Sequence, residues 1–381
     1  MTSLLQKIAL RLRGNVIRIQ PRRPIKGAVL LSYITLPFIA GEETLGAHTN
    51  RWECREIARI FAELGYAVDV VDWESERIPK RDYDIWFDIR PDMEKIAQKV
   101  HGDPYKIFHA TGTYWKFQNE ASRARLNAVA ARRGARLSSG RFQKPGRSVE
   151  IADLITMLGN DFTASTYPLA GKRVVHIPIS TTHIFPSPET KDFEAARRGF
   201  IWLGGAGMAH KGLDLVLEAF AAMPEFTLTA FGKGDADFIN AYHKELYETP
   251  NISYKGQVDI GGREFAEAAS RSIGLVFPSC SEGCAGSVIE CMHVGLIPII
   301  SRESSVDVDG SGIVLRENTK DEIEKEVRRL ASLPAAELAS RATAAWAYAR
   351  ERHTREAFSD AFAALARDVD RLIKERRTAI L

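Results

Sequence analysis

The chain has 381 residues, of which 45% are hydrophobic and 27% charged, as in an ordinary folded globular protein. This composition excludes a disordered chain, a collagen-like fibre and a disulfide-framed mini-protein, and the length predicts two domains. The net charge is +3, but residues 1–26 hold seven basic and no acidic residues, leaving 45 basic against 49 acidic residues in the other 355. The body of the protein is therefore not basic, and nucleic acid is not expected as a partner.

Residues 1–26 are expected to form a basic amphipathic segment. Leucine and isoleucine side chains share one helical face over residues 1–13, beside basic side chains, which suits an anionic membrane surface. A disordered or packed basic tail is the alternative. The sequence has no apolar run long enough for a membrane span and no secretion signal, and its four cysteines need no disulfide. We therefore expect a cytoplasmic protein, peripheral on the inner face of the membrane if this segment binds lipid.

Strands and helices alternate over residues 27–180. Apolar residues at helical spacing predict a helix over 52–64. Short apolar runs predict strands at 27–33, 67–73, 84–89 and 105–109. This alternation is typical of a doubly wound parallel sheet, so we expect a Rossmann-like domain.

Residues 181–198 predict a linker, after which the alternation restarts. A glycine-rich turn is expected at 204–207, followed by a helix over about 213–222. Further strands are expected at 200–203, 226–231, 272–277, 297–301 and 312–315. The sequence thus predicts a second Rossmann-like domain over 199–353 and a C-terminal helix over 354–381 that crosses back to the first domain. Ligands in such sheets bind at the carboxyl ends of the strands, here in the cleft between the halves.

The segment 277–301 carries the clearest chemical signal. Glu282 lies in a loop after a strand, Gly286 begins the next helix, and Glu290 lies one turn into it. The free N–H groups of a helix N-terminus bind a diphosphate, and carboxylates accept hydrogen bonds from paired sugar hydroxyls. The pattern therefore predicts a nucleotide-sugar site, with a solvated helix face and a loop-end charge as the alternative.

The spacing of Glu282 and Glu290 resembles the E-x7-E motif of retaining glycosyltransferases of family 4 (glycosyl transferases group 1). Residues 204–220, with a glycine turn, a Lys-Gly pair and a helix, resemble the same family. The resemblance implies the GT-B fold, in which two Rossmann-like domains face each other across a cleft. It also implies a retaining transfer of sugar from a UDP- or GDP-sugar to a glycan or lipid-linked acceptor, as in surface polysaccharide biosynthesis. Neither a metal nor another cofactor is expected.

The resemblance also implies roles for individual residues. Glu290 would bind the donor ribose and Glu282 the donor sugar, while Lys211 would bind the diphosphate and stabilise the leaving group. Neither glutamate would form a covalent intermediate. The other donor-binding residues would be Gly46, Gly204, Gly205, Gly286, Ser287 and Val288.

The N-terminal half would supply the acceptor side of the site, including His48 and Thr111. His109 is a catalytic candidate near the reacting sugar carbon, and a buried structural histidine is the alternative for it. Thr49 or Asn50 is expected to cap the helix that follows.

The glycine turn departs from the family pattern, in which an arginine precedes the lysine. Residues 205–209 contain no cation, and His210 is the nearest substitute, so the diphosphate would rely on backbone N–H groups or on a base from elsewhere. Residues 132–147 are predicted to form a mobile basic loop near the acceptor, or a plain solvated loop. Asp235 is expected to cap a helix rather than to bind a metal.

Two other functions fit the same scaffold. A nucleotide-sugar or carbohydrate-binding protein without catalysis is favoured by the missing arginine. It is also favoured by the position of His109, two residues before Thr111, where the resemblance would place the family's histidine. A GT-B sugar-nucleotide epimerase would need acid–base carboxylates from both halves, and none can be assigned in the N-terminal half.

Overall fold

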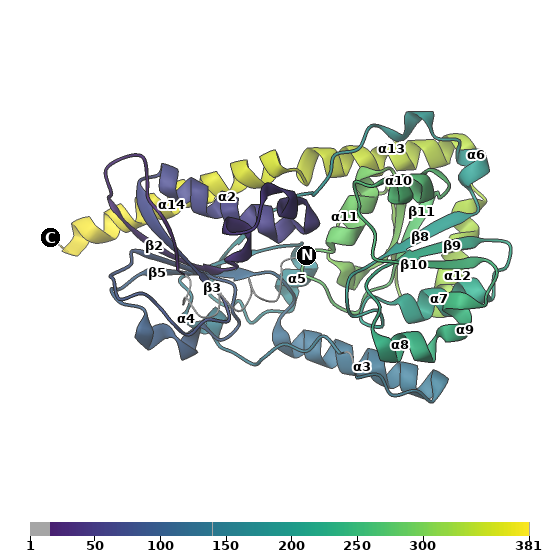
Figure 1. Cartoon of the computed structure of the whole chain (residues 1–381), viewed down its shortest axis with the longest axis horizontal. Helices are drawn as coiled ribbons and strands as arrows, with labels where there is room; N and C mark the ends of the chain where they lie inside the picture. Colours follow the sequence, from purple (N-terminus) through teal and green to yellow (C-terminus); the bar gives the residue numbers. More distant parts are fainter. Residues whose placement is uncertain (1–15, 139, 381) are drawn as a thin grey trace.

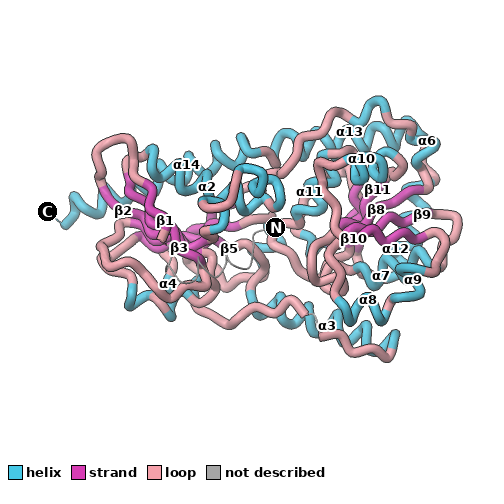
Figure 2. The backbone as a smooth tube through the Cα atoms, viewed as in Figure 1, coloured by secondary structure: helices cyan, strands magenta, loops and turns pink. Residues whose placement is uncertain are grey.

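The computed structural model describes residues 16–138 and 140–380, which form two α/β domains (Figures 1 and 2). The helix expected over residues 1–13 lies outside the described residues. Each domain has a central sheet with helices on its faces (Figure 2). Residues that follow the carboxyl ends of strands in the two sheets contact each other across the domain boundary. This arrangement confirms the expected fold class.

The N-terminal sheet has seven strands, all parallel except β1, which pairs antiparallel with β3. In spatial order they are β1 (Ile17–Ile19), β3 (Tyr66–Asp72), β2 (Gly27–Tyr33), β4 (Ile85–Asp88), β5 (Tyr105–Ala110), β6 (Leu154–Met157) and β7 (Arg173–His176). Strand β1 corrects the expectation of one basic amphipathic segment over 1–26, because residues 17–19 belong to the sheet. Strands β6 and β7 were not expected from the sequence either.

The C-terminal sheet has six strands, and all of them are parallel. In spatial order they are β10 (Ile252–Gly256), β9 (Thr227–Phe231), β8 (Gly199–Leu203), β11 (Gly274–Phe277), β12 (Ile297–Ser301) and β13 (Ile313–Leu315). Five of these strands were expected, and β10 was not.

The helices surround both sheets (Figure 1). Those of the N-terminal half are α2 (Thr49–Glu63), α3 (Trp115–Arg133), α4 (Ser148–Ile151) and α5 (Asp161–Ser165). Those that follow are α6 (Phe193–Ala196), α7 (Leu213–Ala221), α8 (Ala236–Ala241), α9 (His243–Tyr247), α10 (Arg263–Ser270), α11 (Gly286–His293), α12 (Lys320–Ala331), α13 (Ala335–Arg352) and α14 (Arg355–Ile380).

The connection between the domains is shorter than the predicted linker 181–198. Phe193 and Ala196 of α6 are buried in the core of the C-terminal domain. The free connection therefore ends before α6, because an apolar helix face at 193–196 packs with the second sheet.

Helix α14 returns along the N-terminal domain beside α2 (Figure 1). Phe358 and Phe362 are fully buried in the same core as the strands of the first sheet. The ring of Phe362 meets Phe61 and Phe87 edge-on, with centroid distances of 5.6 and 5.7 Å. The last helix of the chain thus completes the core of the first domain.

Helix α3 forms a second, non-covalent contact between the domains, on the side opposite α13 and α14 (Figure 1). Arg125 of α3 donates to Asp214 of α7 (Nη1–Oδ1 3.2 Å) and to the carbonyl oxygen of Pro278 (3.0 Å). Arg132 Nη2 donates to the other oxygen of Asp214 at 2.6 Å. Asp214 and Arg125 are both buried, so this ion pair holds the domains together without screening by solvent.

Replacing Phe362 with alanine should destabilise the protein by about 3–5 kcal/mol, because it leaves a cavity between α14 and the first sheet. The measurement is the urea midpoint followed by tryptophan fluorescence. Phe142→Ala is the matched control, since Phe142 is 50% exposed, and it should change stability by at most about 0.5 kcal/mol. Equal losses for the two variants would contradict the packing of α14.

Replacing Asp214 with alanine should cost about 3–5 kcal/mol, because it leaves the buried charge of Arg125 without its carboxylate. The same urea titration measures this loss. Asp321→Ala is the control, because the Asp321 side chain is 93% exposed beside Lys320 and should contribute less than about 1 kcal/mol. If Asp214→Ala left the stability unchanged, α3 would not hold the second domain in place.

Candidate active site

The loop after β11 contacts the N-terminal domain directly. Ser281 and Thr113 share a hydrogen bond between their hydroxyls, and Thr163 Oγ1 donates to the carbonyl oxygen of Gly283 at 2.9 Å. A side chain at Gly283 would clash with the carbonyl of Thr111, so only glycine allows this approach. Thr111, predicted on the acceptor side, therefore lies against the loop that carries Glu282.

Glu282 lies between two cations, Lys211 and Arg141. We call these three residues the Lys–Glu–Arg cluster. Lys211 Nζ lies 2.6 Å from Glu282 Oε1, and Arg141 Nη1 lies 3.8 Å from Oε2. Burial raises the pKa of Glu282, but Lys211, Arg141 and His210 outweigh it and lower that pKa to about 2. Burial lowers the pKa of Lys211, and Glu282 opposes this change. The structure thus brings two predicted residues together and adds Arg141.

His210 does not replace the missing cation of the glycine turn. Its ring is buried, with Nε2 2.6 Å from the carbonyl oxygen of Ser281 and Nδ1 2.9 Å from Ser122 Oγ. Because a carbonyl only accepts, Nε2 carries the proton and Nδ1 accepts from Ser122. Burial lowers the pKa of His210 to about 4, so the ring is neutral near pH 7. Of the options left open by the sequence, His210 is therefore not the source of the cation.

Asp235 faces the glycine turn, and its side chain does not cap its own helix. Its Oδ2 accepts from the backbone N–H groups of Gly207 (3.0 Å) and Met208 (2.8 Å). Asp235 precedes α8 as expected, but its carboxylate organises the turn instead of capping that helix. Two N–H groups of the turn are thus used within the protein.

The glycines near the predicted donor site differ in their surroundings. A Cβ atom at Gly204 would clash with the ring of Trp202, whereas Gly205 has open space around it. A Cβ atom at Gly46, in the short 3-10 helix (Glu42–Ala47) before α2, would lie 3.9 Å from the ring of His183, which is an ordinary contact. Gly205 and Gly46 therefore leave room for a ligand, and Gly204 is required by packing.

Glu290 is buried on α11 and faces the connection between the domains. It accepts hydrogen bonds from Thr181 Oγ1 (3.0 Å), Thr182 N (2.7 Å) and Thr182 Oγ1 (2.7 Å). Burial raises its pKa, and the bonds from Thr182 and Thr181 oppose this. Two threonine hydroxyls thus contact the carboxylate that was expected to bind ribose hydroxyls, so a ribose must add to these contacts or displace them.

The N-terminus of α11 begins at Gly286, as expected. The N–H group of Val288 donates to Ala285 O at 2.9 Å, and its side chain is buried in the core. Val288 is therefore not an open anion ligand here, which corrects its predicted role. Gly286 and Ser287 remain the donor-side positions of this turn.

The two histidines of the N-terminal half have different positions. His109 is buried on β5, with Nδ1 2.8 Å from Thr156 Oγ1 and its ring beside Phe87, and none of its contacts is to the Lys–Glu–Arg cluster. Burial lowers its pKa to about 3, and its buried Nε2 has no hydrogen-bond partner among the described residues, so the catalytic role of His109 stays a prediction. His48 is the N-cap of α2, where its Nδ1 accepts from Asn50 N (3.3 Å); Thr49 and Asn50 are not the cap.

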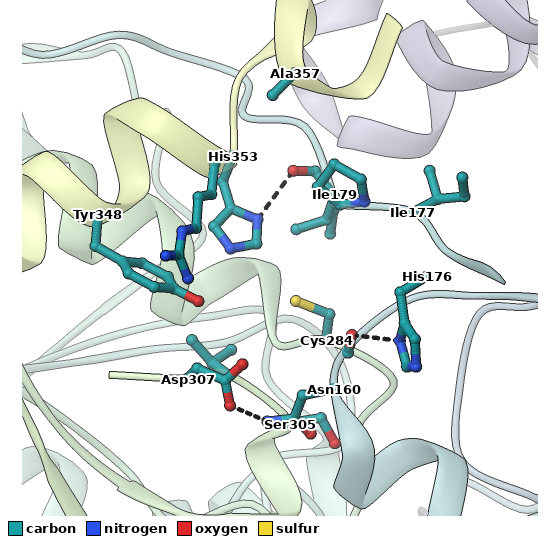
Figure 3. Close-up of a pocket in the computed structure, with 14 residues that line it drawn as sticks. Asn160, His176, Ile177, Ile179, Cys284, Ser305, Asp307, Tyr348, His353 and Ala357 are labelled. Atoms are coloured by element: carbon teal, nitrogen blue, oxygen red, sulfur yellow. Dashed lines mark hydrogen bonds between the residues drawn. The ribbon is translucent and has the colours of Figure 1, made fainter. Parts of the chain in front are cut away.

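A cavity of about 370 Å³ lies at the hinge between the domains (Figure 3). Its wall includes Cys284, Tyr348 and His353, whose Nδ1 lies 3.2 Å from Ile179 O. None of Lys211, Glu282 and Glu290 lines it. This cavity is therefore separate from the predicted donor residues.

The described residues contain no group of three or more His, Cys, Asp or Glu side chains that could hold a metal ion. Among these same residues, no helix is long and apolar enough to cross a membrane.

Comparison with known proteins matches the C-terminal domain to a family. Residues 197–332 match the family described as Glycosyl transferases group 1, which confirms the resemblance seen in the sequence over that domain. This range contains Lys211, Glu282 and Glu290. No curated protein sequence matches the chain.

Solved structures match nearly the whole chain. Sucrose-phosphate synthase from Thermosynechococcus elongatus is 15% identical with a TM-score of 0.62, over 92% of this chain and 100% of that one. WaaG, a glycosyltransferase involved in lipopolysaccharide biosynthesis, is 14% identical with a TM-score of 0.53, over 90% and 99%. HepE of Anabaena, solved with UDP and glucose, is 13% identical with a TM-score of 0.52, over 92% and 99%. The protein therefore has the GT-B fold, and the family match supports a glycosyltransferase.

Replacing Glu282 with glutamine should lower stability at pH 7 by about 1–3 kcal/mol, because buried Lys211 loses its counter-ion. The pKa of Glu282 falls from its usual 4.5 to about 2 on folding, so its stabilisation is complete above pH 4.5 and is lost toward pH 2. The gap in Tm between wild type and Glu282→Gln should therefore narrow over this range. Glu264→Gln, at an exposed position, is the control; a gap that stays constant down to pH 3 would contradict the ion pair.

Proposed function

We propose that the protein is a retaining glycosyltransferase that moves a sugar from a UDP- or GDP-sugar to a glycan or lipid-linked acceptor in surface polysaccharide biosynthesis. The observation that carries this proposal is the buried ion pair of Lys211 and Glu282, which stands beside the residues that contact each other across the domain boundary. The family match over residues 197–332 and the GT-B fold support it. Peripheral attachment to the inner face of a membrane remains part of the proposal.

The chemistry follows from the charges around this pair. When a glycosidic bond to a diphosphate breaks, negative charge grows on the phosphate, and a cation already held in place stabilises it without reorganisation. Lys211 supplies that cation beside the glycine turn, and the N-terminus of α11 adds a positive dipole. Glu282 keeps its charge and accepts hydrogen bonds from the hydroxyls of the donor sugar.

Retention is proposed without a protein nucleophile. Glu282 is engaged by Lys211, and Glu290 accepts three hydrogen bonds from the connection between the domains, so neither carboxylate is a free nucleophile. The acceptor hydroxyl would attack from the face that the leaving phosphate occupies and would lose its proton to that phosphate. His109 stays a predicted second catalytic group, because its buried Nε2 has no hydrogen-bond partner among the described residues.

One observation favours a second candidate, a donor-binding protein without catalysis. The polar groups expected to bind the donor are satisfied within the protein, Glu290 by Thr181 and Thr182, and Lys211 by Glu282. Such a protein would bind a nucleotide sugar and release no product.

The melting temperature in the presence of UDP, GDP and their sugar conjugates tests donor binding. At about one hundred times its dissociation constant, a ligand should stabilise the protein by roughly 2.7 kcal/mol, and Glu290→Ala should lose this shift because the ribose loses its carboxylate. Glu264→Ala, at an exposed position of α10, is the control and should keep the shift.

Turnover then separates the two candidates. Slow hydrolysis of the stabilising donor indicates an enzyme. If the sugar is released with the same anomeric configuration, α or β, that it has in the donor, the reaction proceeds with retention. Stabilisation with no hydrolysis and no transfer to any glycan acceptor indicates the binding protein. If none of the nucleotides or nucleotide sugars shifts the melting temperature, both candidate functions are contradicted.

A further inference from the structure

Arg141 crosses from one domain to the other. It belongs to the loop that follows α3 in the N-terminal half, yet its side chain lies over the glycine turn of the C-terminal domain. A Cβ atom at Gly207 would lie 2.7 Å from Arg141 Cδ, and Gly207 has a positive φ of 86°. Arg141 Nη1 lies 3.8 Å from Glu282 Oε2. A cation is therefore present at a turn whose own sequence has none between 204 and 210.

The backbone that carries Arg141 is held firmly on α3. Its carbonyl oxygen accepts from Gln118 Nε2 at 2.8 Å. Two residues later, Gln143 exchanges a pair of hydrogen bonds with Asn119, of 2.8 and 2.9 Å. These contacts correct the prediction of a mobile loop over residues 132–147, because side chains of α3 bind it at 141 and 143.

The guanidinium group of Arg141, by contrast, has few partners among the described residues. The Arg141 side chain is 45% exposed, and its one ion pair to a described residue, Glu282, is longer than a hydrogen bond. Within residues 16–138 and 140–380 its side chain makes no hydrogen bond. Arginine has five N–H donors in a planar fork that fits phosphate oxygens, so Arg141 has donors to offer to a ligand.

The charges around the turn indicate which ligand fits. Lys211 and Arg141 place two positive charges at this turn, beside the carboxylates of Glu282 and Asp235, and His210 is neutral. Asp235 already uses the N–H groups of Gly207 and Met208, so a phosphate here depends more on side-chain cations than on the backbone. Arg141, with its unused N–H donors above the turn, is therefore the side chain that can meet an anion such as a diphosphate here.

We propose that Arg141 binds the diphosphate of the nucleotide from the opposite domain, together with Lys211. This inference rests on the proposed function and adds a consequence to it. The phosphate site is complete only while α3 is docked on the C-terminal domain through Arg125 and Asp214. Nucleotide binding therefore favours the docked arrangement, and a C-terminal domain alone lacks one of its two phosphate cations.

The test measures the affinity of the full chain for UDP and GDP by calorimetry. Arg141→Ala should weaken binding of the preferred nucleotide about 10- to 100-fold, as expected for the loss of a charge-assisted phosphate contact. Arg141→Lys should recover part of this loss, because it keeps the charge without the fork. The Tm of the ligand-free protein should not change, because the side chain is half exposed.

Two controls distinguish a phosphate contact from a general effect. Arg136→Ala removes the same charge from the same loop, at an exposed position with no ion pair or hydrogen bond to the described residues, and should bind the nucleotide as wild type does. The shift in Tm caused by uridine or guanosine, which lack phosphate, should be equal in wild type and Arg141→Ala.

The outcomes separate this inference from the proposed function. Normal affinity in Arg141→Ala, together with weak binding in Lys211→Ala, would overturn the role of Arg141 and leave the proposed function intact. If Arg136→Ala and Arg141→Ala weaken nucleotide binding equally, the effect comes from the general positive charge of the loop. That result would also overturn the role of Arg141. If wild type binds neither UDP nor GDP, both proposals fail together.

Discussion

The buried ion pair between Arg125 and Asp214 is the constraint on which the arrangement of the two domains depends. It joins α3 of the first half to α7 of the second, opposite the covalent hinge, so the domains are held on two sides. A buried charge that loses its partner is costly, and this makes the docked position of α3 well defined. The contacts of α3 with His210 and the loop that carries Arg141 follow from that position.

In the candidate site, polar groups of the protein stand where ligand groups are expected. Asp235 holds two N–H groups of the glycine turn, the hydroxyls of Thr181 and Thr182 contact Glu290, and Glu282 neutralises Lys211. Buried polar groups need such partners, because an unsatisfied one costs free energy. A ligand must exchange these internal contacts for its own, so binding and local rearrangement are coupled in this site.

Much of the fold could be predicted from local patterns. Long apolar runs such as residues 27–33 and 297–301 are buried on both faces and have few alternatives to a central parallel strand. Strands β1, β7 and β10 were missed because they lie at sheet edges, where partly exposed residues weaken the apolar pattern. Strand β6 is buried inside the sheet and was missed because its apolar run has only four residues. Glu282 and Lys211 could be predicted because each follows a strand end beside glycines.

The sequence by itself determined two α/β domains, the glycine turn and the positions of the two glutamates, because each depends on residues close together in the chain. Only the tertiary structure decided which groups meet. Arg141 approaches Glu282 from the other domain, Thr182 reaches Glu290, and His109 turns into the core, since these contacts depend on how separate strands and helices pack. The missing cation of the glycine turn is therefore supplied by folding rather than by a neighbouring residue.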